Sequence, residues 1–203
     1  MRGIKLLSIV LVVVCIFWVD LSAQGGIKGG INLPDFKSFK PEVLEHKNIT
    51  TWQVGVFYDL LKVTPYLAIH AEVLYIEKGG EVTIMENAAE SVYKYKIDYI
   101  EIPLMLKVNF MPKSFFNPYL IAGPYWAYRA KAKKTGIGLS VDFKDESKSS
   151  DFGLVGGGGL EFKIGGPYIL VEFRYEHGMK NIVKALDNRI KNSSFVFNVG
   201  VGF

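Results

Sequence analysis

Apolar and polar residues alternate along most of the chain after residue 24, with the period of two that is typical of β-strands. The clearest segment is the last one, in which Phe195, Phe197, Val199, Val201 and Phe203 are separated by smaller or polar residues. Seven further segments have the same pattern: 26–32, 51–59, 66–76, 95–110, 117–130, 151–163 and 168–179. The pattern predicts eight strands, most of which reach the roughly 9–11 residues that a tilted strand needs to cross hydrocarbon.

The linkers between these strands alternate in length. The linkers after odd-numbered strands are long and polar (33–50, 77–94, 131–150 and 180–193), and those after even-numbered strands are short (60–65, 111–116 and 164–167). Outer-membrane barrels have short periplasmic turns and longer extracellular loops, and their closure leaves no unpaired strand edge in lipid. The chain is therefore predicted to be all-β: an eight-stranded antiparallel transmembrane β-barrel with short periplasmic turns and long extracellular loops.

The positions of the charged residues decide which face of the barrel points outward. Strict alternation places a continuous, aromatic-rich apolar face on one side of the strands and most charged residues on the other. We predict that the apolar face contacts lipid and that the interior holds a polar network of Glu72, Glu101, Lys107, Arg129, Glu161, Glu172 and Arg174. Charges of both signs are needed there, because an unpaired buried ion costs several kcal/mol. The alternative is a soluble ligand-binding barrel with the two faces exchanged.

The first 23 residues have the features of a secretory signal peptide. Arg2 and Lys5 precede an apolar run over residues 6–19, and small residues follow before Gln24. The run is shorter than the roughly 20 residues of a membrane-spanning helix. We expect residues 1–23 to be the signal peptide, cleaved after Ala23, and residues 24–203 to be the barrel domain.

Composition excludes several classes of function. The 24 basic residues exceed the 20 acidic residues by a formal charge of +4, dispersed along the chain, whereas a nucleic-acid binder concentrates its basic residues. The single cysteine, Cys15, lies in the signal peptide, which excludes a disulfide scaffold or a multi-cysteine metal site in the mature chain.

We find no arrangement of residues that is typical of catalysis, metal binding or cofactor binding. His46, His70 and His177 lie on separate segments without the spacing of metal ligands, although His70 and Glu72 share a strand face. The glycine run 156–159 is not followed by Lys and Ser or Thr, so a close backbone approach or a bulge explains it better than a phosphate loop. No enzymatic activity is expected, and a lipid-directed hydrolase is the least favoured alternative.

Four short motifs carry a family resemblance: residues 26–32 (GIKGGIN), 99–104 (YIEIPL), 118–124 (PYLIAGP) and 174–178 (RYEHG). Their order and spacing resemble the small outer-membrane β-barrel proteins labelled PorT-like or porin-family, within the broader OmpA/OmpX-like eight-stranded group. The resemblance covers essentially all of the mature chain. It implies an outer-membrane location but no single activity, since members include secretion-system components, adhesins and proteins with no known role.

The carboxyl terminus also resembles a known signal. Phe203 is preceded at alternate positions by Val201, Val199 and Phe197, similar to the signal that the barrel-assembly machinery reads. The expected location is the outer membrane of a Gram-negative bacterium, with outer-membrane lipid, lipopolysaccharide and, during biogenesis, the assembly machinery as partners. The basic cluster Lys131, Lys133 and Lys134 is a candidate contact for lipopolysaccharide phosphates.

We expect a structural or interaction role through the extracellular loops, with a protein partner there. The alternatives are a component of an outer-membrane protein-export apparatus, as the PorT resemblance allows, or a narrow channel. Eight strands enclose an interior that side chains fill, which excludes a wide porin.

Overall fold

The computed structural model describes residues 24–37, 43–86, 89–136, 139–142, 149–179 and 191–203, so the predicted signal peptide lies outside the described residues. It contains ten strands: β1 Gly25–Lys37, β2 Val43–Asn48, β3 Thr51–Thr64, β4 Leu67–Glu86, β5 Ala89–Asn109, β6 Phe116–Gly136, β7 Leu139–Asp142, β8 Ser150–Lys163, β9 Tyr168–Gly178 and β10 Lys191–Gly202. Among the described residues there is no helix of the length and hydropathy needed to cross a membrane.

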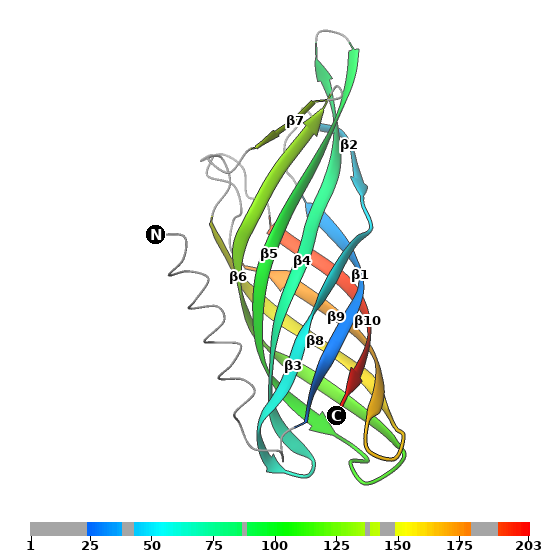
Figure 1. Cartoon of the computed structure of the whole chain (residues 1–203). Helices are drawn as coiled ribbons and strands as arrows, with labels where there is room; N and C mark the ends of the chain where they lie inside the picture. The colour runs from blue at the N-terminus through cyan, green and yellow to red at the C-terminus, as the bar shows by residue number, and fades with distance from the viewer. Residues whose placement is uncertain (1–23, 38–42, 87–88, 137–138, 143–148, 180–190) are drawn as a thin grey trace, which may run out of the picture.

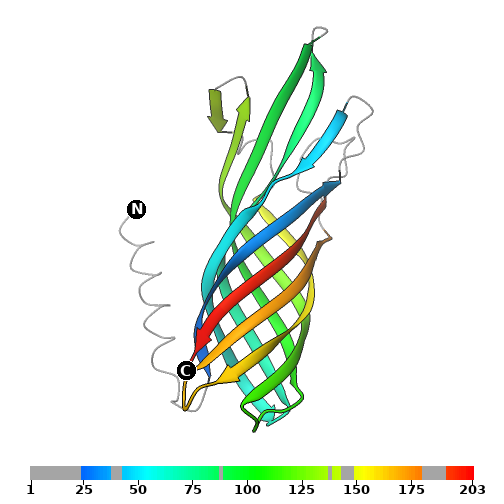
Figure 2. The ribbon, with the colours of Figure 1, turned by 90° about the vertical axis from the view of Figure 1, so that its right-hand side faces the viewer.

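Eight of the strands close into a barrel of antiparallel pairs. Their order around the barrel is β4-β3-β1-β10-β9-β8-β6-β5, and pairing of β5 with β4 completes the ring. The first and last strands pair along their whole length, from Gly26 opposite Gly202 to Lys37 opposite Lys191. Figures 1 and 2 show the tilted strands wrapping around one long cylinder. The predicted eight-stranded antiparallel barrel is confirmed.

Both ends of the barrel domain meet at one end of this cylinder. Backbone hydrogen bonds join Gly25 and Phe203 in both directions, at 3.2 and 2.9 Å. The three connections at the same end are short, and Gly165 in the β8–β9 connection adopts a positive φ of 69°, which favours glycine. In an outer-membrane barrel this is the periplasmic end.

At the opposite end, three strands extend far beyond the others. β4, β5 and β6 have 20, 21 and 21 residues, whereas β9 has 11 and β10 has 12. β4 and β5 remain paired as far as Glu86 opposite Ala89, and the short strands β2 and β7 pair with the outer parts of β4 and β6. Figure 2 shows this part of the sheet rising above one side of the barrel.

The prediction of long loops is therefore wrong in part for three of the four segments. Residues 77–94 are almost entirely strand, and 33–50 and 131–150 each contain one of the short strands together with a strand end. Outside lipid a strand needs no continuous apolar face, so these segments lack the alternation that identifies membrane-spanning strands. The fourth predicted loop, 180–193, lies mostly outside the described residues.

The two faces of the barrel wall have the predicted orientation. Leu104 and Phe197 are 40% and 44% exposed on the outer surface, whereas Glu172 and Arg174 are 2% and 0% exposed in the interior. Such a surface is stable against acyl chains and unfavourable in water. The alternative of a soluble barrel with exchanged faces is therefore wrong.

Aromatic side chains gather on the outer surface toward the extracellular end. The ring centres of Trp52 and Tyr75 lie 5.6 Å apart, and those of Trp126 and Phe152 lie 5.4 Å apart. The ring centres of Tyr175 and Phe195 lie 4.8 Å apart. Aromatic residues at this level anchor a barrel at the membrane–water interface. We call these residues the outer girdle, and the strand extensions lie beyond it.

Candidate functional site

The centre of the barrel is occupied by a network of buried ion pairs. Lys28 on β1 lies between two carboxylates, with its Nζ 2.5 Å from Glu72 Oε1 and 2.8 Å from Glu172 Oε1. Arg174 on β9 donates from Nη1 to Glu72 Oε2 at 2.8 Å. Tyr119 donates its hydroxyl to the other oxygen of Glu172 at 3.0 Å. Four strands are thus connected through the interior by charged hydrogen bonds.

A second group of ion pairs lies on the extracellular side of this centre. Lys78 Nζ is 2.7 Å from Glu101 Oε2 and 2.9 Å from Glu176 Oε2, and it lies 4.7 Å from the centre of the Tyr125 ring. Arg174 joins the two groups, because its Nη2 is 3.0 Å from Glu176 Oε1. The fully buried guanidinium thus connects the central group of ion pairs with the second group.

A third group lies toward the periplasmic end. Lys107 Nζ is 2.6 Å from Glu161 Oε1 and 3.5 Å from Asp59 Oδ2. His70 lies between two carboxylates, with Nδ1 2.6 Å from Asp59 and Nε2 3.1 Å from Glu72. His70 thus connects this group to the central one, so the predicted proximity of His70 and Glu72 is part of a structural network.

Glycines on the inner face make room for the large charged and aromatic side chains. A Cβ atom built at Gly157 would lie 2.5 Å from the Arg174 Cβ, and one at Gly159 would lie 2.5 Å from the Tyr119 ring. The glycine run keeps a continuous register with both neighbouring strands. The close approach predicted for this run is therefore confirmed, and the alternative of a bulge is wrong.

The structure brings together six of the seven residues predicted for the interior network: Glu72, Glu101, Lys107, Glu161, Glu172 and Arg174. The seventh, Arg129, is half-buried near the extracellular end of β6, opposite Tyr99 in register. Sequence reasoning missed Lys28 and Asp59, which the alternation of their strands could have found. Lys78 was not accessible to that reasoning, because it lies in a segment predicted to be a loop.

Buried carboxylates outnumber buried cations among the described residues. The acids are Asp59, Glu72, Glu101, Asp151, Glu161, Glu172 and Glu176, and the bases are Lys28, Lys78, Lys107 and Arg174. Glu101 Oε1 and Tyr125 Oη have no hydrogen-bond partner within the described part of the chain. Loss of a cation should therefore destabilise the interior more than loss of a carboxylate that has a single partner.

The interior charges and the histidines can be compared with the arrangements that catalysis or metal binding requires. The charged groups of the interior are engaged with one another, and in the described ranges no group of three or more His, Cys, Asp or Glu side chains is placed to hold a metal ion. His177 is exposed on β9, with its ring 6.4 Å from that of Tyr175, and His46 lies in β2. The histidines thus occupy different parts of the molecule.

The residues predicted to form the assembly signal lie on the outer surface of β10 and at the end of the chain. Phe197, Val199, Val201 and Phe203 are 44–73% exposed. They form the side of the strand that faces lipid. Their part in assembly stays a prediction.

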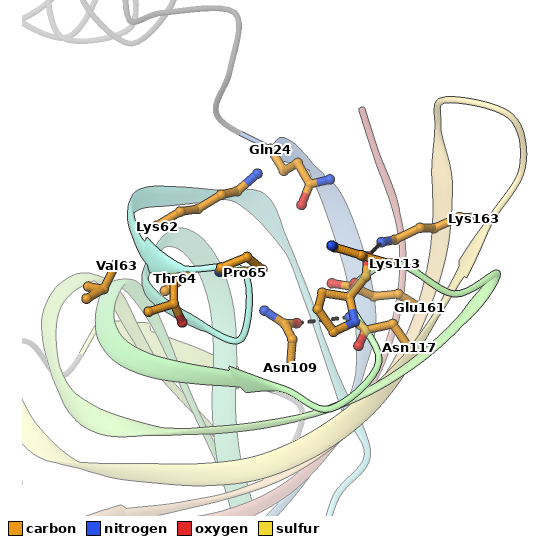
Figure 3. A pocket seen from close by; sticks show the side chains of 12 residues that line it. Gln24, Lys62, Val63, Thr64, Pro65, Asn109, Lys113, Asn117, Glu161 and Lys163 are labelled. Atoms are coloured by element: carbon orange, nitrogen blue, oxygen red, sulfur yellow. Dashed lines mark hydrogen bonds between the residues drawn. The ribbon is translucent and has the colours of Figure 1, made fainter.

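A pocket of about 470 Å³ opens at the periplasmic end of the barrel. Its wall is formed by the ends of β3, β5 and β8, the starts of β4 and β6, the β3–β4 and β5–β6 connections, and the residue before β1 (Figure 3). The lining residues are Gln24, Lys62, Val63, Thr64, Pro65, Ala68, Asn109, Pro112, Lys113, Asn117, Glu161 and Lys163. We call this the periplasmic pocket. Glu161, which pairs with Lys107, forms part of its wall.

A closed barrel with a lipid-facing apolar wall and a charged interior defines an integral outer-membrane protein. The chain belongs to the outer membrane protein beta-barrel domain family, whose model matches residues 20–184. The protein therefore resides in the outer membrane of a Gram-negative bacterium, with its outer wall in lipid. The narrower label PorT-like stays a prediction, and no curated protein matches the chain.

Several solved structures are similar to this chain. OprG from Pseudomonas aeruginosa is 14% identical over 89% of this chain and 94% of its own, with a TM-score of 0.53. Ail of Yersinia pestis, solved in complex with the heparin analogue sucrose octasulfate, is 16% identical over 90% of this chain and 100% of its own, with a TM-score of 0.48. Neisserial surface protein A is 14% identical over 88% and 97%, with a TM-score of 0.49. At these identities the comparisons concern the fold alone.

Proposed function

We propose that this protein is a non-enzymatic barrel that binds a partner at the cell surface through its protruding sheet. We define the extracellular sheet as β2, β7 and the parts of β4, β5 and β6 beyond the outer girdle. The observation that carries the proposal is the continuous pairing of β4 with β5 as far as Glu86 opposite Ala89.

The extent of this pairing exceeds what a membrane anchor needs. Eleven residues of β4 (76–86) and eleven of β5 (89–99) lie beyond Tyr75 and its register partner Ile100, which at about 3.3 Å per residue is roughly 36 Å of strand. Backbone pairing holds this extension in one shape, whereas a loop of equal length would lose conformational entropy on binding. A preformed surface of this kind is suited to recognition.

The composition of the extracellular sheet also favours binding. Lys96 and Glu77 form an ion pair at 2.7 Å, and Asp98 accepts a hydrogen bond from Tyr75 of the outer girdle at 2.6 Å, so the base of the extracellular sheet carries polar contacts. β2 and β7 each pair on one side among the described strands, which leaves backbone donors and acceptors at two edges. A partner strand can add to such an edge.

The barrel interior supports this function over transport. Tyr119 and Tyr125 are 4% and 0% exposed, the ion pair of Arg174 with Glu72 joins opposite strands, and Lys28 of β1 pairs with the same Glu72. The interior of an eight-stranded barrel is just wide enough for side chains to fill, so this filling argues against a continuous aqueous path. We expect no conductance above background when the protein is inserted into planar bilayers, and a reproducible single-channel current would favour the narrow-channel alternative.

An excision variant tests the binding function. Residues 80–95 are replaced by Asn-Gly, which joins the register partners Gly79 and Lys96 with a two-residue hairpin turn. The barrel should still show heat-modifiable migration on gels, because its membrane-spanning pairs are unchanged. A partner is identified by cross-linking from Lys96 on intact cells, and its affinity is then measured for both proteins.

We expect the excision to reduce that affinity at least tenfold, about 1.4 kcal/mol. The matched control shortens residues 180–190, which follow β9 and precede β10 in the sequence, and should leave the affinity unchanged. Equal affinity of the excision variant and the native protein would refute the proposal. Capture of export-machinery subunits whose binding survives the excision would favour the export-apparatus alternative.

A further inference from the structure

We propose that the periplasmic pocket is a binding site for a small, multiply charged anion, such as a phosphate ester or a polycarboxylate. This site lies at the opposite end of the barrel from the extracellular sheet and is independent of the function proposed above. The inference rests on the charge of the lining, on the donors that it presents and on its volume.

Three lysines from separate parts of the chain line the pocket. Lys62 lies near the end of β3, Lys113 in the β5–β6 connection and Lys163 at the end of β8. Figure 3 shows these side chains distributed around the pocket mouth. The Lys163 ammonium also donates a hydrogen bond to the carbonyl of Pro112, which holds it at the mouth. Ammonium groups that converge from several elements favour a ligand with more than one negative charge.

The acidic residue of the lining does not cancel this charge. Glu161 accepts from Lys107 at its Oε1 atom, at 2.6 Å, and from Asn117 at its Oε2 atom, at 2.7 Å. Both carboxylate oxygens are therefore already engaged, and the charge is offset by Lys107 behind the pocket wall. The net charge that the pocket presents to a ligand is positive.

A neutral donor lies deeper in the pocket. Asn117 donates from Nδ2 to the Oδ1 atom of Asn109 at 2.9 Å, which leaves the Asn109 amide nitrogen turned toward Thr64 and Pro65 (Figure 3). The same Asn117 accepts a hydrogen bond from the backbone of Met111 at 3.0 Å, so its orientation is held from both sides. The Asn109 amide is thus a preorganised donor for an anionic oxygen.

The size of the pocket limits the ligand to a small molecule. About 470 Å³ lies within the range of roughly 300–1,000 Å³ that is typical of small-molecule sites. The pocket opens at the end with the short turns, so the ligand must come from the periplasm. A compact metabolite with two or three phosphate or carboxylate groups fits these conditions.

Isothermal titration calorimetry of the native protein, purified in a zwitterionic detergent, tests the proposal. Inorganic pyrophosphate and citrate are the two probes, and glycerol is the uncharged control. We expect saturable binding of at least one anion, and the stronger of the two shows whether phosphate or carboxylate is preferred. The proposal would be overturned if neither anion saturated the protein at concentrations up to about 1 mM.

Variants show whether the lysines form the site. Lys62→Gln and Lys163→Gln should each weaken binding about tenfold, the effect of one lost charge-assisted hydrogen bond. Lys113→Glu should abolish binding, and because Lys113 is exposed in a turn this variant keeps the fold testable by heat-modifiable migration. Lys131→Gln, an exposed lysine at the extracellular end, is the matched control. Equal binding by native protein and Lys113→Glu, or an equal loss in Lys131→Gln, would overturn the assignment.

Discussion

Arg174→Met is the sharpest test of how the interior stabilises the barrel. The side chain is fully buried, and three carboxylates surround it: Glu72 Oε2 at 2.8 Å, Glu176 Oε1 at 3.0 Å and Glu172 Oε1 at 3.8 Å. Methionine retains most of the apolar stem, so the substitution mainly removes the charge. The result isolates the electrostatic contribution of one guanidinium.

The expected loss follows from the partners that remain. Breaking a buried ion pair from one side costs about 3–5 kcal/mol, because the remaining charge stays buried. Glu72 keeps Lys28 and Glu176 keeps Lys78, so neither carboxylate is left without a cation. We therefore expect a loss near the lower limit, about 3 kcal/mol, in the free energy of unfolding.

Urea unfolding of the barrel in phospholipid vesicles measures this loss. Trp52 and Trp126 are exposed on the outer wall, so their fluorescence reports insertion into lipid. Lys131→Met removes an exposed charge and is the control, with an expected change of less than about 1 kcal/mol. A loss below about 1 kcal/mol for Arg174→Met would refute the view that the charged interior depends on its pairing.

Three further predictions concern the interior and the outer wall. Glu101→Gln should cost less than about 1 kcal/mol and Glu72→Gln about 3 kcal/mol, because the Glu101 carboxylate accepts a hydrogen bond from Lys78 whereas Glu72 binds two cations and His70. Unfolding in urea compares the two variants, and equal losses would contradict the argument. Gly157→Ala should destabilise by about 1–3 kcal/mol and Gly156→Ala by much less, since the first Cβ meets the Arg174 Cβ at 2.5 Å and the second meets only a backbone oxygen at 4.0 Å; a larger loss at Gly156 would show that the inner face is not the crowded one. Leu104→Arg should cost about 2–4 kcal/mol when measured in vesicles, as for an arginine near the middle of the bilayer, and a neutral result would place Leu104 outside lipid.

The strand pattern predicted most of the membrane-spanning barrel, for a physical reason. Lipid requires an apolar side chain at every second position, and the narrow interior requires the intervening ones to be small or paired. In β9 these two requirements apply to successive residues. The side chains therefore alternate without exception between interior and surface, as in Glu172, Phe173, Arg174 and Tyr175. The same logic allowed six members of the interior network to be predicted from the chain alone.

The extracellular sheet could not be predicted in this way. Beyond the outer girdle the outer face of β4 and β5 no longer contacts lipid, so it does not need an apolar residue at every second position. The alternation in the sequence therefore ends near Ile76 although the strand continues to Glu86, and Lys78 and Ile97 remain buried on the inner face. Pairing between Lys78 and Ile97, or between Gly80 and Tyr95, depends on a register that only the assembled sheet defines. Residues 77–94, which the sequence predicts to be a loop, thus form much of the extracellular sheet.

Local periodicity by itself determined the fold class, the orientation of the wall and the need for charges of both signs inside, because each follows from what lipid and a narrow lumen tolerate. The tertiary structure decided which charges meet. Lys28 lies 144 positions from Glu172 and Arg174 lies 102 positions from Glu72, yet each pair touches across the interior. It also decided that Lys62, Lys113 and Lys163 surround one pocket, since closing the cylinder brings the ends of distant strands together while the chain keeps them apart.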